Sequence, residues 1–172
     1  MKKFLLTAAF FLTAVIFTEV KAQTTGSTVL SVKLETAQSI RVNHAAVLLT
    51  LNTSDHYTNG VAIDQANHIT FASNVGFKIS AKGTDLTNGA GEVIEIGNIT
   101  IKPTQGTTGS TGTLTTTALD ADDTIIYSSA SAEVGGTNGA NLNINYKAAG
   151  GTPFLNKTGT FTSNITYTIA PF

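Results

Sequence analysis

The strongest constraint on the fold is a two-residue alternation of apolar and polar side chains near the C-terminus. In residues 141–146, Leu142, Ile144 and Tyr146 occupy one parity and three asparagines occupy the other. Because successive side chains of a β-strand point to opposite faces of a sheet, this pattern predicts a strand with one buried and one solvated face. A second alternation, over residues 161–169, predicts a longer half-buried strand.

Shorter strands are expected elsewhere, each bounded by turn residues. They are Val29–Leu34, Ser39–Asn43, Ala46–Leu51, Ile69–Ser73, Phe77–Lys82 and Ile125–Ser128. Between Val93 and Ile101 the apolar parity switches, which predicts either a β-bulge or a tight hairpin turn at Gly97-Asn98, with the bulge favoured. No strand alternates with a helical pattern, as a parallel α/β fold would require.

The N-terminus has the organisation of a cleaved signal peptide. Lys2 and Lys3 precede an apolar run over residues 4–17, and Val20-Lys21-Ala22 has the small-residue pattern of a cleavage site. The run is shorter than the roughly 20 residues of a membrane-spanning helix. We therefore expect removal of residues 1–22 to leave a mature chain without a membrane span. Its expected location is extracellular or at the cell surface, with the periplasm as the alternative.

The mature chain, residues 23–172, has the length of a single domain. It is rich in Thr, Ser, Asn, Gly, Val and Ile and has no Cys, so packing and strand pairing must stabilise it without disulfides. About seven to ten short antiparallel strands predict an all-β fold, specifically an immunoglobulin-like β-sandwich. The expected core comprises Leu30, Val32, Leu49, Phe77, Ile79, Ile101, Leu142, Ile144, Phe161, Ile165 and Tyr167.

Three segments carry a resemblance to known proteins: GFKISAK at 76–82, ITIKP at 99–103, and TGTF at 158–161 running on to YTI at 167–169. In this order they resemble small secreted bacterial proteins of the fimbria-like type, which belong to surface β-sandwich families of unknown function. The resemblance implies an immunoglobulin-like sandwich at the cell surface or in a secreted fibre, without a cofactor. This chain lacks the Trp of WxL-type peptidoglycan-binding domains and the Cys pair of many pilins.

The three histidines, His44, His56 and His68, are each 12 residues from the next. Three histidines can hold a metal ion with one open position, but this spacing matches no local ligand motif. We expect three unrelated surface histidines and no metal site.

An acidic cluster, Asp120, Asp122 and Asp123, offers the oxygen ligands that Ca²⁺ prefers. The Gly and the closing Glu of an EF-hand do not follow, so a solvated acidic turn is favoured over a calcium site. Asp123-Thr124-Ile125 also resembles the acceptor triplet of some bacterial periplasmic O-glycosylation systems, which makes Thr124 a candidate modification site.

No motif indicates catalysis. The chain has no G-x-S-x-G elbow, no Cys, and no glycine-rich loop followed by a helix start and a well-placed Lys. Glu92 and Glu95 would lie on opposite faces of a strand. We expect a non-enzyme without a cofactor. Loss of the leader makes the chain more acidic than the net charge of −1 of the full sequence, which argues against nucleic-acid binding.

These observations favour a structural or adhesive surface protein, for example a fimbria-like subunit. The alternating segment Thr28–Leu34 could join a neighbour's sheet by strand addition, although an ordinary first strand of its own domain is the favoured interpretation. One alternative is an extracellular module that binds a glycan or ice through its polar Asn and Thr rows. Another is a small outer-membrane β-barrel ending in Phe172, which the lack of aromatic girdles disfavours.

Overall fold

The structure is a computed structural model that describes residues 25–135 and 139–172. The predicted leader, residues 1–22, lies outside the described residues, and its cleavage stays a prediction. The chain divides into two units, Met1–Lys33 and a compact unit, Leu34–Phe172, that carries the strands described below. Within the described ranges, no helix is long and apolar enough to span a membrane.

The fold is all-β, as predicted, and its larger sheet has five antiparallel strands. In spatial order they are β1 (Gln38–Val42), β2 (Val61–Ser73), β10 (Ala140–Ala148), β6 (Ile99–Gln105) and β8 (Thr117–Ala118). The alternating segment predicted at 141–146 is the centre of β10, in the middle of the sheet. Its apolar residues Leu142, Ile144 and Tyr146 are buried as predicted.

The second sheet has four antiparallel strands. Their order is β11 (Ile165–Pro171), β3 (Phe77–Gly83), β9 (Thr124–Ser129) and β7 (Thr113–Leu114). The remaining elements are a two-stranded ribbon of β4 (Leu86–Thr87) and β5 (Val93–Ile94), a short helix α1 (Ser54–Asn59), and the 3₁₀ turns η1 (Ile96–Asn98) and η3 (Thr152–Phe154).

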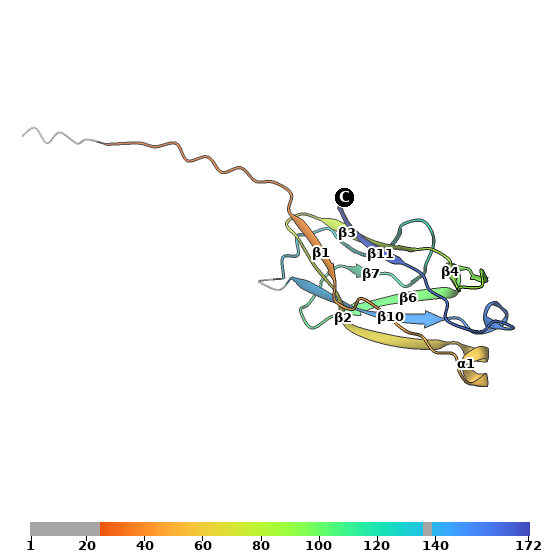
Figure 1. Ribbon diagram of the computed structural model, residues 1–172. Helices are drawn as coiled ribbons and strands as arrows, with labels where there is room; N and C mark the ends of the chain where they lie inside the picture. The colour runs from red at the N-terminus through yellow and green to blue at the C-terminus, as the bar shows by residue number, and fades with distance from the viewer. Residues whose placement is uncertain (1–24, 136–138) are drawn as a thin grey trace, which may run out of the picture. The chain divides into compact units, whose positions relative to one another are not determined.

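The two larger sheets pack against each other and share one core (Figure 1). The ring of Phe71 on β2 lies 5.4 Å from that of Phe77 on β3 and 5.3 Å from that of Tyr127 on β9, measured between ring centroids. Ile79 and Ile101, both members of the expected core, are fully buried between the sheets. The immunoglobulin-like assignment stays a prediction.

The predicted first strand, Val29–Leu34, is wrong. Residues 25–33 contain no strand, and the expected core residues Leu30 and Val32 are 85% and 74% exposed. Alternation is a local property, whereas a strand also needs a neighbouring strand to pair with, and among the described residues no strand is assigned beside this segment.

Two further predictions are corrected. Ala46–Leu51 is extended but belongs to no strand, and of the predicted core Leu49, Phe161, Ile165 and Tyr167 are only partly buried. The parity switch at Gly97-Asn98 is neither a bulge nor a hairpin turn. It is η1, where the chain leaves the small ribbon at β5 and enters the five-stranded sheet at β6.

Candidate functional site

The most distinctive feature of the compact unit is a cleft between two open sheet edges. β1 is the end strand of the five-stranded sheet, and β11 is the end strand of the four-stranded sheet. β1 stops at Val42, and one more backbone bond, from the Asn43 N–H to the His68 carbonyl oxygen (2.8 Å), prolongs its pairing with β2. Beyond that bond the cleft opens.

One rim of the cleft is the extended segment that follows β1. The backbone of residues 45–51 makes no hydrogen bond within the described part of the chain. Its side chains still alternate, because Val47, Leu49 and Leu51 pack against the core while Leu48 is 70% exposed. The rim therefore has the side-chain pattern of a strand without a strand's hydrogen bonds.

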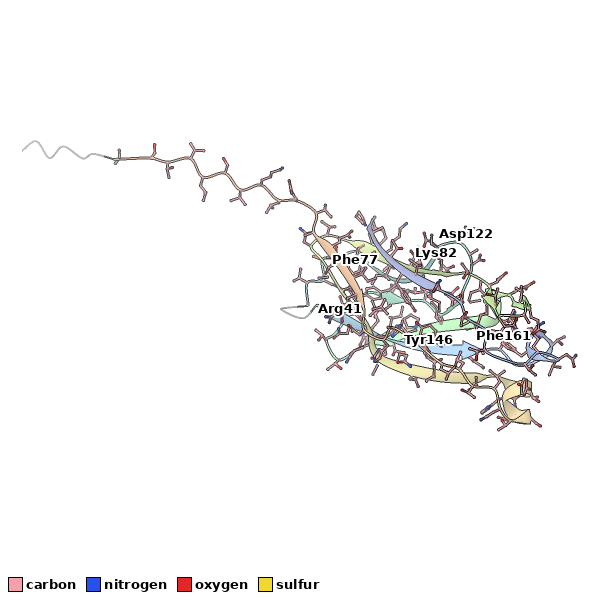
Figure 2. The ribbon with its side chains drawn as sticks, viewed as in Figure 1. Arg41, Phe77, Lys82, Asp122, Tyr146 and Phe161 are labelled. Atoms are coloured by element: carbon pink, nitrogen blue, oxygen red, sulfur yellow. The ribbon has the colours of Figure 1, made fainter. Side chains whose placement is uncertain are left out.

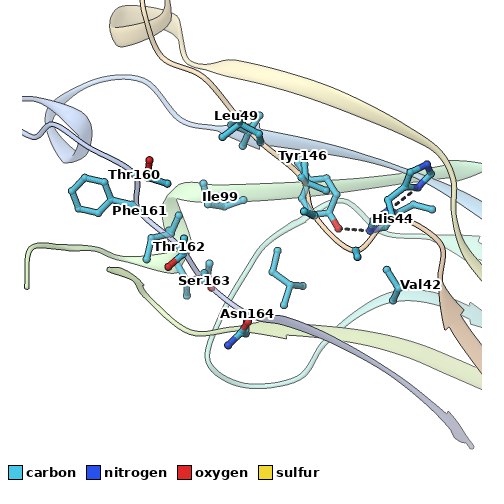
Figure 3. Close-up of a pocket in the computed structure, with 18 of the residues that line it drawn as sticks. Val42, His44, Leu49, Ile99, Tyr146, Thr160, Phe161, Thr162, Ser163 and Asn164 are labelled. Atoms are coloured by element: carbon cyan, nitrogen blue, oxygen red, sulfur yellow. Dashed lines mark hydrogen bonds between the residues drawn. The ribbon is translucent and has the colours of Figure 1, made fainter. Parts of the chain in front are cut away.

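The opposite rim is formed by residues 160–165 and by Tyr167, leading into and along β11 (Figure 3). Thr162 pairs with Thr87 through a β-bridge, and β11 pairs with β3 from Ile165 onward. Ile96, Ile99 and Leu86 line the interior, so the cleft is mainly apolar. It has a volume of about 370 Å³, within the range of ligand-binding clefts.

A hydrogen-bonded chain of four side chains lies at one end of the cleft. His68 on β2 is buried, and its Nε2 atom is 2.8 Å from the hydroxyl of Tyr146 on β10. That hydroxyl also shares a short hydrogen bond with the hydroxyl of Tyr167 on β11. On the other side, His68 Nδ1 is 3.3 Å from His44 Nδ1, and the two imidazole rings stack with centroids 5.4 Å apart.

Burial controls the ionisation of this chain. Desolvation, and secondarily the proximity of His44, lowers the pKa of His68 to about 4, so the ring is neutral at pH 7. Desolvation raises the pKa of Tyr146 to about 12, and burial also raises that of Tyr167 well above its usual value. Because His68, Tyr146 and Tyr167 are neutral near pH 7, these three side chains close one end of an apolar cleft without placing a charge there.

The sequence-based interpretation of the histidines is therefore partly wrong. His68 is buried and contacts His44, and only His56 is a separate surface residue, in α1. Nothing local in the sequence brings His44 and His68 together, because the antiparallel pairing of β1 with β2 does so. The sequence signal that could have indicated a buried polar partner was Tyr146, because a tyrosine on the buried parity of a strand needs a hydrogen-bond partner for its hydroxyl.

The acidic cluster forms a turn at the surface. Asp122 lies at the exposed surface of this turn (Figure 2). Asp120 Oδ1 accepts from the Asp122 N–H at 3.3 Å, and the Asp123 carboxylate lies 3.8 Å from Lys82 Nζ. Across residues 25–135 and 139–172, no group of three or more His, Cys, Asp or Glu side chains is placed to hold a metal ion. Thr124 opens β9 and is half-buried, with its hydroxyl 3.4 Å from the Asp122 carbonyl oxygen.

The asparagine row on β10 is bonded to neighbouring strands. Asn141 Nδ2 donates to Thr70 Oγ1 (2.9 Å), Asn143 Nδ2 donates to the Gln105 carbonyl oxygen (2.7 Å), and Asn145 Nδ2 donates to Asp64 Oδ1 (2.8 Å). Each of these side-chain amides therefore donates a hydrogen bond within the protein. This arrangement holds neighbouring strands together, and the alternative of a glycan or ice surface stays a prediction.

Comparisons with known proteins assign no family. No protein-family model matches the sequence, and no curated protein matches it.

Proposed function

We propose that this chain is an exported, non-catalytic structural protein of the cell surface whose copies associate by strand addition through Thr28–Leu34. The observation that carries the proposal is the exposure of this segment. Leu30, Val32 and Leu34, which share one parity, are 85%, 74% and 88% exposed. An exposed row of alternating large apolar side chains is characteristic of an interaction segment.

The energetics favour a bound state for this segment. Burying one Leu or Val side chain contributes about 1.5–3 kcal/mol, so three such residues supply a substantial driving force for association. Main-chain pairing with a sheet edge adds hydrogen bonds and fixes the register. A segment left in water would gain neither contribution.

The test compares substitutions on the two faces of the segment. Replacing Leu30 and Val32 with Thr places β-branched, strand-compatible side chains at both positions but removes most of the apolar surface. We expect wild-type mature protein purified from surface extracts to form ladders or filaments, and L30T/V32T to run as a monomer with an unchanged circular dichroism spectrum. Size-exclusion chromatography with light scattering and negative-stain microscopy measure both states.

The matched control is V29T, which removes an apolar side chain from the opposite face of the same segment. It should retain most of the wild-type assembly. A wild-type protein that stays a monodisperse monomer in surface extracts, and at high concentration after purification, would contradict the proposal.

A further inference from the structure

We infer that the cleft between residues 45–51 and β11 is the acceptor for Thr28–Leu34 of a second copy of this chain. This inference rests on the proposed function and specifies the partner surface. The incoming segment would lie as an added strand between the two rims, with Leu30, Val32 and Leu34 directed into the cleft.

The backbone of the rim at residues 45–51 is unpaired within the described chain. Residues 46–51 have the sequence pattern of a strand, and their alternate side chains do face the core, yet the backbone of 45–51 has no hydrogen-bond partner in the described chain. A row of unpaired N–H and C=O groups on an extended segment is a template for another strand. An added strand explains why the sequence predicts a strand that the isolated chain does not form.

The opposite rim includes β11, the end strand of its sheet. β11 pairs with β3 along its whole length and ends the sheet order, so no strand in the described ranges is hydrogen-bonded to its other edge, although β1 of the facing sheet lies close to it. Ile165 and Tyr167 on β11 are only partly buried, and Phe161 just before it is also partly buried. A strand added at this edge would cover all three side chains.

The segment Thr28–Leu34 matches the cleft in size and chemistry. Side chains two residues apart on a strand are separated by about 6.6–6.8 Å, so the seven-residue segment extends over roughly 23 Å. The rim at 45–51 also has seven residues. Leu30, Val32 and Leu34 would meet Leu49, Ile99 and Ile96, and the neutral His68 ring imposes no penalty of a buried charge.

The occupant must come from another copy. Only residues 35–37 connect Leu34 to β1, and they would have to reverse direction and pass the length of β1 to reach the cleft beyond Val42. The four peptide units from Leu34 to Gln38 span at most about 14 Å, and β1 itself spans about 13 Å, which leaves no chain for the reversal. A neighbouring copy meets no such restriction.

The experiment uses thiol cross-linking, because the native chain has no Cys. A donor variant, Ser31→Cys, carries its thiol on the outward face of the segment and is mixed with one of three acceptor variants that each carry a single exposed thiol. Leu48→Cys and Thr160→Cys place the thiol on the two rims, and Ile125→Cys is the control on β9. A short bismaleimide reagent links the thiols, and mass spectrometry of the linked peptides identifies each pair.

We expect donor-to-rim cross-links at both Leu48→Cys and Thr160→Cys, at least fivefold more abundant than those to Ile125→Cys. Oligomers that form without rim cross-links, or with equal cross-linking at the control, would overturn the acceptor assignment while leaving self-association intact. A mixture without oligomers would overturn the proposed function as well.

A second variant tests the same surface without cross-linking. Ala46 is exposed and lines the cleft, so Ala46→Arg places a charged side chain at the mouth without disturbing the core. We expect at least a tenfold loss of oligomer with an unchanged thermal transition of the monomer. Ala121→Arg, at an exposed position in the acidic turn, should assemble like the wild type. Equal assembly of both variants would contradict the inference.

Discussion

Among single residues, His68 combines features that are rarely found together. It is 2% exposed, and both of its ring nitrogens have a partner, Tyr146 on one side and His44 on the other. A neutral imidazole has one donor and one acceptor nitrogen, so it can serve both partners at once. An imidazolium could only donate, and it would have to be desolvated.

This arrangement predicts an acid-sensitive fold. The folded pKa of His68, about 4, lies below the unfolded value of 6.5, so the unfolded chain binds more protons between these pH values. The contribution of His68 to stability is therefore present above pH 6.5 and is lost as the pH falls toward 4, by up to about 3 kcal/mol. Urea denaturation between pH 7 and pH 4 should show this slope.

The variant H68Q should flatten that slope, because glutamine does not titrate. H56Q is the matched control, since His56 is a partly exposed histidine of α1 outside the cleft, and it should keep the wild-type slope. A wild-type slope in H68Q would show that the acid sensitivity has another origin.

A second prediction at this scale concerns Tyr127 and Glu133. The buried hydroxyl of Tyr127 donates to Glu133 Oε1 at 2.6 Å and accepts from the Gly112 N–H at 2.7 Å. Y127F removes both bonds and leaves the Gly112 N–H without its acceptor, while Glu133 Oε1 keeps only its bonds from Thr111, so we expect a loss of about 1–3 kcal/mol in the free energy of unfolding. Y57F, at a partly buried tyrosine of α1, should change stability by less than about 0.5 kcal/mol. Chemical denaturation compares them, and similar losses in both would contradict the prediction.

At the scale of elements, the connection from α1 to β2 depends on Gly60. This residue has a φ of +81°, and a Cβ atom added there would lie 2.2 Å from the carbonyl oxygen of Ala148 at the end of β10. Gly91 has nearly the same φ, +82°, but the space around it is open. Comparing substitutions at Gly60 and Gly91 therefore distinguishes the cost of backbone strain from the cost of a steric clash.

We expect G91A to lose about 1 kcal/mol, because only the strain of a positive φ is added. G60A should lose clearly more, since the backbone of β10 must also move away. Thermal denaturation of the two variants measures the difference. Equal losses would mean that the end of β10 yields to the added methyl group.

At the scale of the whole molecule, stability belongs to the compact unit from Leu34 onward. Residues 25–33 are exposed and contribute no strand. Deleting residues 23–33 from the mature protein should therefore change the Tm of the dilute monomer by less than about 2 °C, the shift expected of roughly half a kcal/mol. Differential scanning calorimetry measures this change. A loss near 10 °C would instead make the segment a strand of its own domain.

Much of the fold could be read from the sequence. The strands at residues 141–146 and 77–82 were predicted from the sequence, and for 141–146 the buried face was predicted as well. Period-two alternation is a local property, because the polarity of each side chain indicates whether its face of the sheet is buried or solvated. The all-β class followed from the same patterns. The long β2 was only partly recognised, since the sequence marked its second part, 69–73, and missed the preceding residues.

The tertiary structure decided which alternating segments are paired. Residues 29–34 and 46–51 have the same kind of pattern as β10, yet neither forms a ladder, because pairing requires a neighbour that only the assembled fold provides. The contact between His68 and Tyr146 likewise arises from the packing of strands distant in sequence. The sequence by itself determined strands and faces, and the long-range packing of the sheets decided where the edges stay open.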